Sequence, residues 1–487
     1  MKKITILLLF VSIMTKGNVY YVAADGGDTN SGTSLSSPFK TISKAVGIAI
    51  AGDIIYLRGG TYAISATITL TKSGTDKMPI RLEGYSEERP LLDFSGTIFG
   101  TRGIDLRGNF WHIKGLDVRK AGDNGILISG AYNTIEFCSF FENMDSGMQL
   151  SGGAHDNQIF DCDSYWNADP TDYGDADGFS CKLDVGTNNS FYGCRAWLNV
   201  DDGWDGYLRG NDDVSTVLVN CWSWMNGYFK DGTDAGANAN GNGFKMGGSD
   251  DKTLKHNFAL KNCVSFDNKG KGFDQNSNVG SMVLYNCSAY RNTGDNYSIY
   301  KTLAAGKICT ITNCINFEGK VTLGSFVNQT TNSWMVPFIV TNDDFVTLDT
   351  TGVSGARSSD GNLPKVNFFH LNESSDLIDA GTNVGLVFSG SAPDLGAFEH
   401  IVTAIEKIDE YYNKLNPFFS GDNLVFNFNQ KPDGNMICKL YDLKGQLAYQ
   451  TQIDANVNQI NCGGLINGLY ILELSQGDRQ FVFKVIK

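Results

Sequence analysis

The chain has 487 residues, of which 39 are Lys or Arg and 53 are Asp or Glu, so its formal net charge is −14. This charge argues against a nucleic-acid partner held through phosphate contacts. Hydrophobic residues make up 41% of the chain and charged residues 19%, which is enough to build a large core in two or three domains of about 150 residues each. With 56 Gly and only 9 Pro, the composition indicates a folded chain with many tight turns.

The N-terminus has the pattern of a secretory signal peptide. Met1 to Lys3 form a charged start, and the apolar run from Ile4 to Met14 is too short to span a bilayer. We place cleavage near Gly17, so that residues 1–17 are removed from a soluble exported protein; a buried N-terminal strand is the alternative. No later stretch has the ~18 continuous apolar residues of a membrane helix.

The cysteines recur in matched local contexts. The chain has 11 Cys and no C-x-x-C pair, which argues against a zinc site. The repeated contexts favour an internal ladder of small apolar thiols over disulfides. The repeating positions are Cys138, Cys162, Cys194, Cys221, Cys263, Cys287 and Cys314.

A Gly-anchored repeat runs through the middle of the chain. Each unit begins with a polar residue, Gly and an apolar residue, and it continues with a short alternating strand, the Cys strand and an Asn-containing turn. The anchors are Gly125, Gly147, Gly178, Gly203, Gly243 and Gly272, at spacings of 22, 31, 25, 40 and 29 residues. A minimum near 22 with variable insertions predicts coils of a parallel β-helix, which stack ~4.8 Å apart and carry their insertions at the turns.

Both ends of the repeat region have their own pattern. Val19 to Ala23 predicts a strand, and Pro38 to Ile50 predicts an amphipathic helix that caps the open end of the solenoid. We expect coils from Ile54 to about Phe398, which gives a β-helix domain over residues 18–400. Residues 401–415 follow as a linker, with a short helix within Val402 to Leu415.

Residues 416–487 predict a small C-terminal β-sandwich. The expected strands are Leu424–Asn427, Met436–Leu443, Gln446–Ile453, Gly468–Leu474 and Gln480–Ile486, with a hairpin turn over Leu443–Gln446. Asn416-Pro417, Tyr441 to Gly445, Gly468 to Tyr470 and Lys484 to Lys487 make this unit resemble the C-terminal sorting domain of the Bacteroidetes type IX secretion system. The resemblance implies contact with secretion machinery and a secreted or cell-surface location. A generic β-sandwich that packs on the solenoid is the alternative.

Aligned anchors bring acidic residues together. Because strands alternate with a period of two, the second residue after each Gly points outward, and Lys245 lies one coil above Asp205. Asp177 stacks under Asp202, beside Asp201 and Asp205. Four carboxylates so close repel one another unless a cation neutralises them, and an all-oxygen set without His or Cys favours Ca²⁺. A run of solvated turn aspartates is the alternative.

A lysine beside a calcium site suggests proton abstraction next to a carboxylate. The ion would bind a uronate carboxylate, acidify C5–H and depress the pKa of Lys245, so that the neutral amine acts as a base in β-elimination of the 4-O-linked group. Alternatively, Asp205 and Asp274 make only a salt-bridge ladder with Lys245. Carboxylates without a metal would raise the pKa of Lys245 and weaken this chemistry.

The same residues carry a family resemblance. Asp177, the run Asp201 to Asp205 and the run Gly243 to Gly248 resemble polysaccharide lyase family 9, the calcium-dependent right-handed β-helix lyases of pectic polymers. With Tyr20 to Ala23 and Pro38 to Ile42, the resemblance covers roughly residues 18–400. It implies cleavage of homogalacturonan or of the rhamnogalacturonan I backbone, with Lys245 as Brønsted base. The calcium ligands that it implies are Asp177, Asp201, Asp202 and Asp205.

Other residues near the predicted site suit an acidic polysaccharide. Arg209, Tyr207, Lys271 and Lys230 are candidates for binding further uronates, because Arg forks match carboxylates. The insertion Gly227 to Gly241 is expected to form one wall of a cleft. Trp222, Trp224 and Tyr228 lead into it, although the two Trp side chains also fit a core role.

Two other functions fit a β-helix. A pectin-active glycoside hydrolase would use paired carboxylic acids and water, but the Gly-His-Gly and Arg-x-Lys motifs that polygalacturonase-like β-helices share are absent from this sequence. A non-catalytic glycan-binding β-helix would hold calcium for structure alone and would leave Lys245 unexplained. We expect a monomer.

Overall fold

The computed structural model describes residues 17–358, 361–400, 417–426, 436–442, 447–453, 459–466, 468–476 and 479–487. Three sequence predictions therefore lie wholly or largely outside the described residues. They are the signal peptide of residues 1–17, the linker helix within Val402–Leu415 and the hairpin turn Leu443–Gln446.

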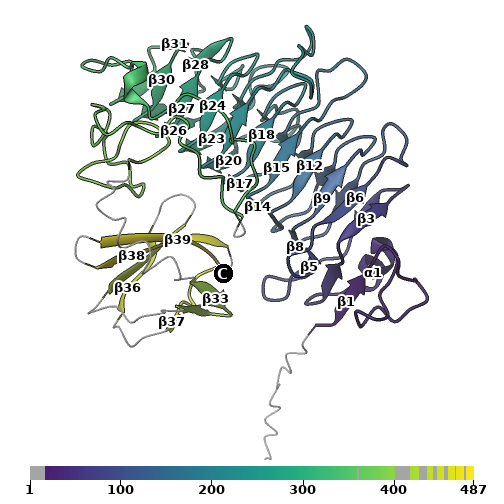
Figure 1. Cartoon of the computed structure of the whole chain (residues 1–487). Helices are drawn as coiled ribbons and strands as arrows, with labels where there is room; N and C mark the ends of the chain where they lie inside the picture. Colours follow the sequence, from purple (N-terminus) through teal and green to yellow (C-terminus); the bar gives the residue numbers. More distant parts are fainter. Residues whose placement is uncertain are drawn as a thin grey trace, which may run out of the picture.

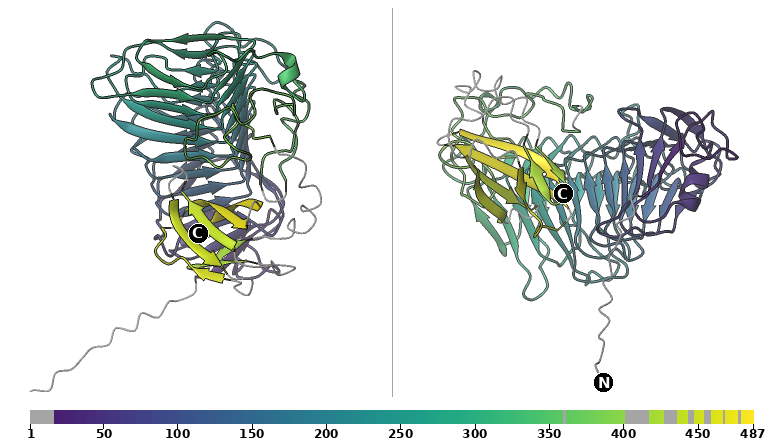
Figure 2. Two further views of the ribbon diagram at one scale, coloured as in Figure 1. Left: turned by 90° about the vertical axis from the view of Figure 1, so that its left-hand side faces the viewer. Right: turned by 90° about the horizontal axis from the view of Figure 1, so that it is seen from below.

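Three long parallel sheets run along one axis and enclose a common core (Figures 1 and 2). Sheet A contains β1 (Val19–Val22), β2 (Ile54–Leu57), β5 (Ile80–Gly84), β8 (Trp111–Lys114), β11 (Thr134–Glu136), β14 (Gln158–Phe160), β17 (Asn189–Tyr192), β20 (Val214–Val219), β23 (His256–Lys261), β26 (Met282–Tyr285), β29 (Cys309–Thr312) and β32 (Val327–Thr330). Sheet B contains β3 (Gly60–Ala63), β6 (Pro90–Asp93), β9 (Asp117–Arg119), β12 (Ser139–Phe141), β15 (Asp163–Tyr165), β18 (Arg195–Trp197), β21 (Trp222–Trp224), β24 (Val264–Phe266), β27 (Ser288–Tyr290) and β30 (Ile315–Phe317). Sheet C contains β4 (Ile68–Leu70), β7 (Ile104–Leu106), β10 (Ile126–Ile128), β13 (Met148–Leu150), β16 (Phe179–Cys181), β19 (Trp204–Asp205), β22 (Phe244–Lys245), β25 (Phe273–Asp274), β28 (Asp295–Ile299) and β31 (Lys320–Leu323). Each coil visits sheets C, A and B in turn, which confirms the predicted parallel β-helix.

The predicted register is confirmed in the sheet that follows the Gly anchors. The first residue after each anchor points inward, and after the last four anchors this residue is aromatic. With Tyr297, which pairs with Phe273 on the next coil, these rings form a stack with centroids 4.8 to 5.1 Å apart. That spacing follows the ~4.8 Å separation of paired strands. The stack contains Phe179, Trp204, Phe244, Phe273 and Tyr297.

The corner between sheets A and B depends on single residues with positive φ. Asp161, Asn220 and Asn262 have φ of 48°, 54° and 52°. Asn and Asp tolerate this left-handed conformation better than other non-Gly residues, so one residue can turn the chain sharply. A Cys follows each of these corners, and all 11 cysteines are free and buried, as the thiol ladder predicted.

The N-terminal helix is shorter than the pattern predicted. Helix α1 spans Ile42–Ile48 and packs against β1, β2 and β4, where it covers the first coil as a cap. The segment before it stays extended because the Phe39 N–H donates to the Tyr21 carbonyl over 2.9 Å. The Asp28 carboxylate also accepts the N–H groups of Lys40 and Thr41, and Thr41 then caps the helix.

The coils end earlier than we expected. The last strand of the solenoid is β32, and within the described part of residues 331–400 the regular elements reduce to one 3-10 helix, η1 (Asn342–Asp344). This segment instead buries Phe368 and Leu371 in one hydrophobic cluster with Trp222 and Trp224 of sheet B. This segment therefore covers apolar side chains on the outer face of sheet B.

The C-terminal part forms the predicted small sandwich beside the solenoid (Figure 1). One antiparallel sheet contains β33 (Phe418–Ser420), β34 (Asn423–Val425) and β37 (Gln459–Asn461); the other contains β35 (Met436–Tyr441), β36 (Leu447–Ile453), β38 (Leu469–Gln476) and β39 (Arg479–Ile486). Leu424 and Leu472, one from each sheet, share a buried core. β33 and β37 were not predicted from the sequence. Among the described residues, no helix is long and apolar enough to cross a membrane.

Candidate active site

The outer face of sheet C positions the predicted site. Asp205 pairs with Ser180 on the coil before it and with Lys245 on the coil after it, and Lys245 pairs with Asp274. These residues therefore form the outward column that the period of two predicts. Asp177 and Asp202 stand at the turns that lead into β16 and β19.

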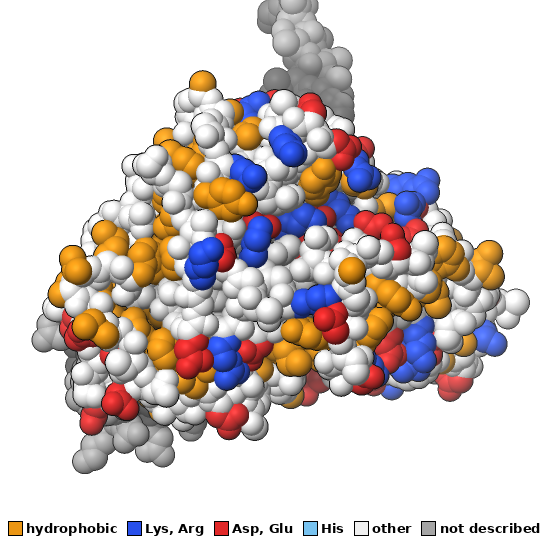
Figure 3. Space-filling model, turned by 90° about the horizontal axis from the view of Figure 1, so that it is seen from above, with side chains coloured by type: hydrophobic (Ala, Val, Ile, Leu, Met, Phe, Trp, Pro, Cys, Tyr) orange, Lys and Arg blue, Asp and Glu red, His pale blue; other side chains and the backbone are white. Residues whose placement is uncertain are grey.

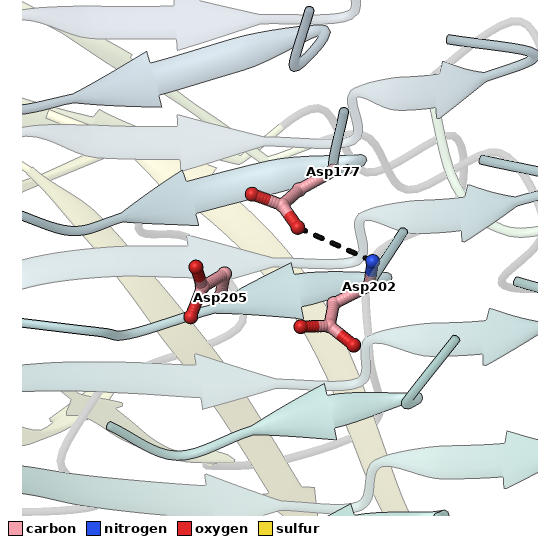
Figure 4. Close-up of side chains that lie close together, drawn as sticks. All are labelled: Asp177, Asp202 and Asp205. Atoms are coloured by element: carbon pink, nitrogen blue, oxygen red, sulfur yellow. Dashed lines mark hydrogen bonds between the residues drawn. The ribbon is translucent and has the colours of Figure 1, made fainter. Parts of the chain in front are cut away.

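Three of the four predicted metal ligands meet in one cluster. Asp177, Asp202 and Asp205 each offer a carboxylate oxygen, and these oxygens lie within 4.8 Å of one another (Figure 4). The Asp202 N–H donates to Asp177 Oδ1 over 3.2 Å, which ties the two coils together. All three residues are buried. Within the described residues, no other group of three or more His, Cys, Asp or Glu has this geometry.

Asp201 lies beside the cluster and outside that set of three. Its Oδ1 accepts the N–H of Asn240 over 2.7 Å, and the residue is buried. Asn240 belongs to the insertion of residues 227–241, so this carboxylate fastens the insertion above the site. Burial, followed by repulsion from Asp202 and Asp177, raises the pKa of Asp201 well above its ordinary value.

Lys245 reaches into the cluster from the next coil. Its Nζ lies 3.0 Å from Asp202 Oδ2 and 3.3 Å from Asp205 Oδ1, and 12% of its side chain is exposed. Burial lowers the pKa of Lys245, but the surrounding carboxylates, led by Asp202 and Asp205, raise it well above its ordinary value. Lys245 is therefore an ammonium ion while the carboxylates carry no other cation.

A second lysine in the cluster was missed by the sequence analysis. Lys182 Nζ lies 2.7 Å from Asp177 Oδ2 and 3.9 Å from Asp205 Oδ2, and its side chain is 9% exposed. The signal was present, because Lys182 stands two residues after the outward Ser180 and so points to the same face. Burial raises the pKa of Asp205, but Lys245 and Lys182 together bring it below its ordinary value.

The cluster fits a hard divalent cation. Asp202 Oδ2 is buried and accepts no hydrogen bond, although it forms an ion pair with Lys245. Burial raises the pKa of Asp177 and of Asp202, and nearby carboxylates add to that effect, so ionising them together costs free energy. A bound cation would offset that cost, and the all-oxygen donor set is the one that Ca²⁺ prefers.

The predicted substrate residues divide into two groups. Tyr207 and Arg209 lie beside the cluster: the Tyr207 ring is 5.7 Å from Lys245 Nζ, and the Arg209 guanidinium is 5.7 Å from the same ring. Lys271 Nζ binds Asp274 over 3.0 Å on the coil after Lys245. Lys230 Nζ instead lies 3.9 Å from the centroid of the Trp166 ring and pairs with Glu142.

The insertion of residues 227–241 packs against the turn that precedes β16. Ala235 and Ala239 share a small buried cluster with Ala176 and Val200. The Asn238 side chain also donates to the Asp172 carbonyl over 3.2 Å. These contacts support the predicted wall beside the carboxylates, whereas Trp222 and Trp224 belong to the core over sheet B. Figure 3 shows Lys and Arg side chains gathered along a hollow on one face of this acidic protein.

Both parts of the chain are similar to known proteins. Residues 20–318 match the family described as Pel9A-like, right handed beta helix region, and residues 416–487 match a secretion system C-terminal sorting domain. Pectate lyase L of Dickeya chrysanthemi is 37% identical over 401 residues, which cover 80% of this chain and 91% of that protein.

Two solved structures are also similar. The crystal structure of pectate lyase Pel9A is 36% identical, with a TM-score of 0.73, and the match covers 80% of this chain and 97% of that one. A structure titled rhamnogalacturonan lyase is 25% identical, with a TM-score of 0.66, over 73% of this chain and 97% of that one.

Proposed function

Because the chain belongs to the Pel9A-like right-handed β-helix family, we propose that it is a secreted, calcium-dependent lyase that cleaves 4-O-linked galacturonate in pectic polymers by β-elimination. It is a polysaccharide lyase of the pectate or rhamnogalacturonan type. The observation that carries the finer assignment is the position of Lys245. Its Nζ lies 3.0 Å and 3.3 Å from two carboxylates of the acidic cluster, on the outer face of one rigid sheet.

Asp177, Asp202 and Asp205 would hold the ion, with Asp201 beside them. When bound, Ca²⁺ supplies positive charge that attracts the substrate carboxylate and makes the neighbouring C5–H more acidic. The chain's own contribution is to hold Lys245 where burial favours its neutral form. When the carboxylates hold a cation, less negative charge remains to stabilise the Lys245 ammonium. The Lys245 amine can then act as a base near neutral or alkaline pH.

The reaction balances without a further reactant. The C5–H bond breaks, the proton moves to Lys245 Nζ, and the electron pair forms the C4–C5 double bond. The C4–O4 bond breaks as this double bond forms, its electron pair leaves with the sugar oxygen, and that oxygen takes a proton from solvent. The products are a new chain end and a 4,5-unsaturated uronate, and deprotonation of Lys245 to solvent resets the site.

Unesterified homogalacturonan is the substrate that we favour. Relatives named pectate lyase reach 37% and 40% identity, in Dickeya chrysanthemi and Paenibacillus polymyxa, while the structure titled rhamnogalacturonan lyase reaches 25%. The rhamnogalacturonan I backbone is the second candidate, because it contains 4-O-linked galacturonate too. Arg209 and Lys271 are the groups that we expect to bind neighbouring uronates, since both flank Lys245.

Export is supported by the C-terminal part of the chain. Residues 416–487 match a sorting domain of a secretion system, and the sandwich core is closed by its own side chains. We therefore propose that this unit meets the secretion machinery and that the β-helix acts outside the cell, where pectic polymers occur.

The test mixes the purified protein with polygalacturonate and, separately, with rhamnogalacturonan I, with CaCl₂ or with a chelator. We expect a calcium-dependent rise in the ultraviolet absorbance of unsaturated uronate on polygalacturonate. A rise on rhamnogalacturonan I alone would move the substrate to that polymer. New reducing ends without new absorbance would instead indicate hydrolysis. The absence of both signals on both polymers would contradict the proposal.

A further inference from the structure

Lys182 is a buried cation that the proposed chemistry does not use. Its Nζ contacts Asp177 Oδ2 at 2.7 Å, the Asp175 carbonyl at 3.3 Å and Asp205 Oδ2 at 3.9 Å. Two of these three partners are predicted metal ligands. The ammonium therefore shares its carboxylates with any ion that enters the cluster.

The orientation of Asp177 does not depend on Lys182 alone. Asp177 Oδ2 also accepts the hydroxyl of Ser180 over 2.7 Å and the hydroxyl of Ser146 over 3.2 Å. Asp177 Oδ1, on the other side of the carboxylate, accepts the Asp202 N–H. Removal of the lysine would leave three of these hydrogen bonds in place, so the main loss is positive charge.

Lys182 offsets part of the negative charge that would hold a divalent ion. When ionised, the carboxylates of Asp177, Asp201, Asp202 and Asp205 carry four negative charges, and the ammonium group of Lys182 compensates one of them. Three negative charges remain for Ca²⁺ once Lys245 is neutral, as the proposed reaction requires. A fixed positive charge at this range still repels an entering cation strongly, because a buried site screens poorly.

On the premise of the proposed function, we propose that Lys182 is a resident counter-ion that keeps the ion-free cluster folded and, in return, weakens its affinity for Ca²⁺. Lys182 thus sets the calcium concentration at which the site fills. Its contacts differ from those of Lys245, whose Nζ lies 3.0 Å from Asp202 Oδ2 and 3.3 Å from Asp205 Oδ1. Lys182 acts through the carboxylates and is a positioning residue.

The test measures CaCl₂ binding to the full chain by titration calorimetry, together with melting temperatures with and without CaCl₂. Lys182→Met and Lys182→Gln remove the charge, and Lys182→Arg retains it. We expect both neutral variants to bind Ca²⁺ about tenfold tighter than the unmodified chain. We also expect them to melt at a lower temperature without calcium, because a buried carboxylate loses its cation. Their melting temperature should then rise more on addition of CaCl₂ than that of the unmodified chain. Lys182→Arg should stay close to the unmodified chain.

Lys114→Met is the matched control, since Lys114 pairs with Glu136 on sheet A, and its calcium affinity should not change. Equal or weaker calcium affinity in both neutral variants would overturn the inference, as would failure of both to fold even with calcium. Neutral variants that fold only with calcium would support the inference, because the ion then replaces the positive charge of Lys182.

The two levels of failure are distinguishable. An unmodified chain that binds no Ca²⁺ would refute the calcium dependence of the proposed function and this inference with it. An unmodified chain that binds Ca²⁺ and shows calcium-dependent elimination, alongside neutral variants of unchanged affinity, would refute the role of Lys182 alone.

Discussion

Lys245 and Asp205 occupy partner positions on the paired strands β22 and β19, and Lys245 Nζ lies 3.3 Å from Asp205 Oδ1. The candidate base and a candidate metal ligand are thus neighbours on one sheet face, and the strand register fixes the distance between them. Backbone hydrogen bonds hold that register along the whole solenoid. The site therefore needs no loop movement to bring its central groups together.

Calcium should stabilise the fold through the carboxylate cluster. An ion at about 100 times its Kd adds ~2.7 kcal/mol to the free energy of unfolding. We expect this gain in the unmodified chain and its loss in Asp202→Asn, because Asn lacks the negative charge that the ion needs. Melting temperatures with CaCl₂ and with chelator measure the gain. Asp234→Asn is the control, since Asp234 pairs with Lys269 on an exposed part of the insertion. A calcium gain equal in both variants would contradict the predicted site.

Acid should weaken the attachment of the segment after β32. Asp163 binds Arg195 and Arg357, each at 2.7 Å. Burial opposes ionisation, but Arg357 and Arg195 outweigh it and lower the pKa of Asp163 from 3.8 to about 2. The folded-state pKa lies below the unfolded one, so this contribution is complete above pH ~4 and is lost as the pH falls toward 2.

The shift corresponds to about 2 kcal/mol of stability. Urea unfolding at pH 7 and at pH 3 measures how much is lost. Asp163→Asn should be less stable than the unmodified chain at pH 7 and should lose less stability on acidification, because the titrating group is gone. An identical pH dependence in the variant would show that Asp163 does not provide it.

Arg209 should contribute to substrate binding more than to the chemical step. Its guanidinium lies near the Tyr207 ring, its side chain is 61% exposed, and its partner Asp250 is exposed as well. We expect Arg209→Ala to raise KM about three- to tenfold and to leave kcat nearly unchanged, since a binding group helps ground state and transition state alike. Steady-state kinetics on polygalacturonate measure both. Arg81→Ala on sheet A is the control, and an equal KM increase in that variant would contradict the assignment.

Trp224 should act in the core and not in the cleft. Its ring stacks between Trp197 and Phe266, with centroids 4.9 Å and 5.6 Å away. Truncation of a buried Trp typically costs ~3–5 kcal/mol. Trp224→Ala should therefore lower the melting temperature while KM stays unchanged for the molecules that remain folded. A raised KM with unchanged stability would show instead that Trp224 belongs to the cleft wall.

Much of the solenoid could be predicted because its repeat is local. Gly anchors and Cys strands recur within each coil, and a period of two then decides which side chains face outward, as with Asp205 and Lys245. The course of the chain after β32 could not be predicted in this way. Phe368 and Leu371 are buried by sheet B, and no local period marks that contact.

The candidate site, too, could be predicted from the sequence only in part. Asp177, Asp202 and Asp205 meet because stacked coils superimpose equivalent positions, which the alignment of anchors captures. Lys182 was overlooked because the alignment stopped at the second residue after Gly, one outward position too early. The contact of Asp201 with Asn240 depends on how a 15-residue insertion folds back, and spacing alone says nothing about that.

The most direct test of the central claim is the rate of unsaturated-uronate formation from polygalacturonate by Lys245→Met, with saturating CaCl₂ and calcium binding measured on the same sample. We predict that kcat falls by about 10²–10⁴-fold, the range of a lost general base, while Ca²⁺ still binds and the fold is retained. A calcium-loaded, folded variant that still forms product within tenfold of the unmodified rate would show that another group removes the proton.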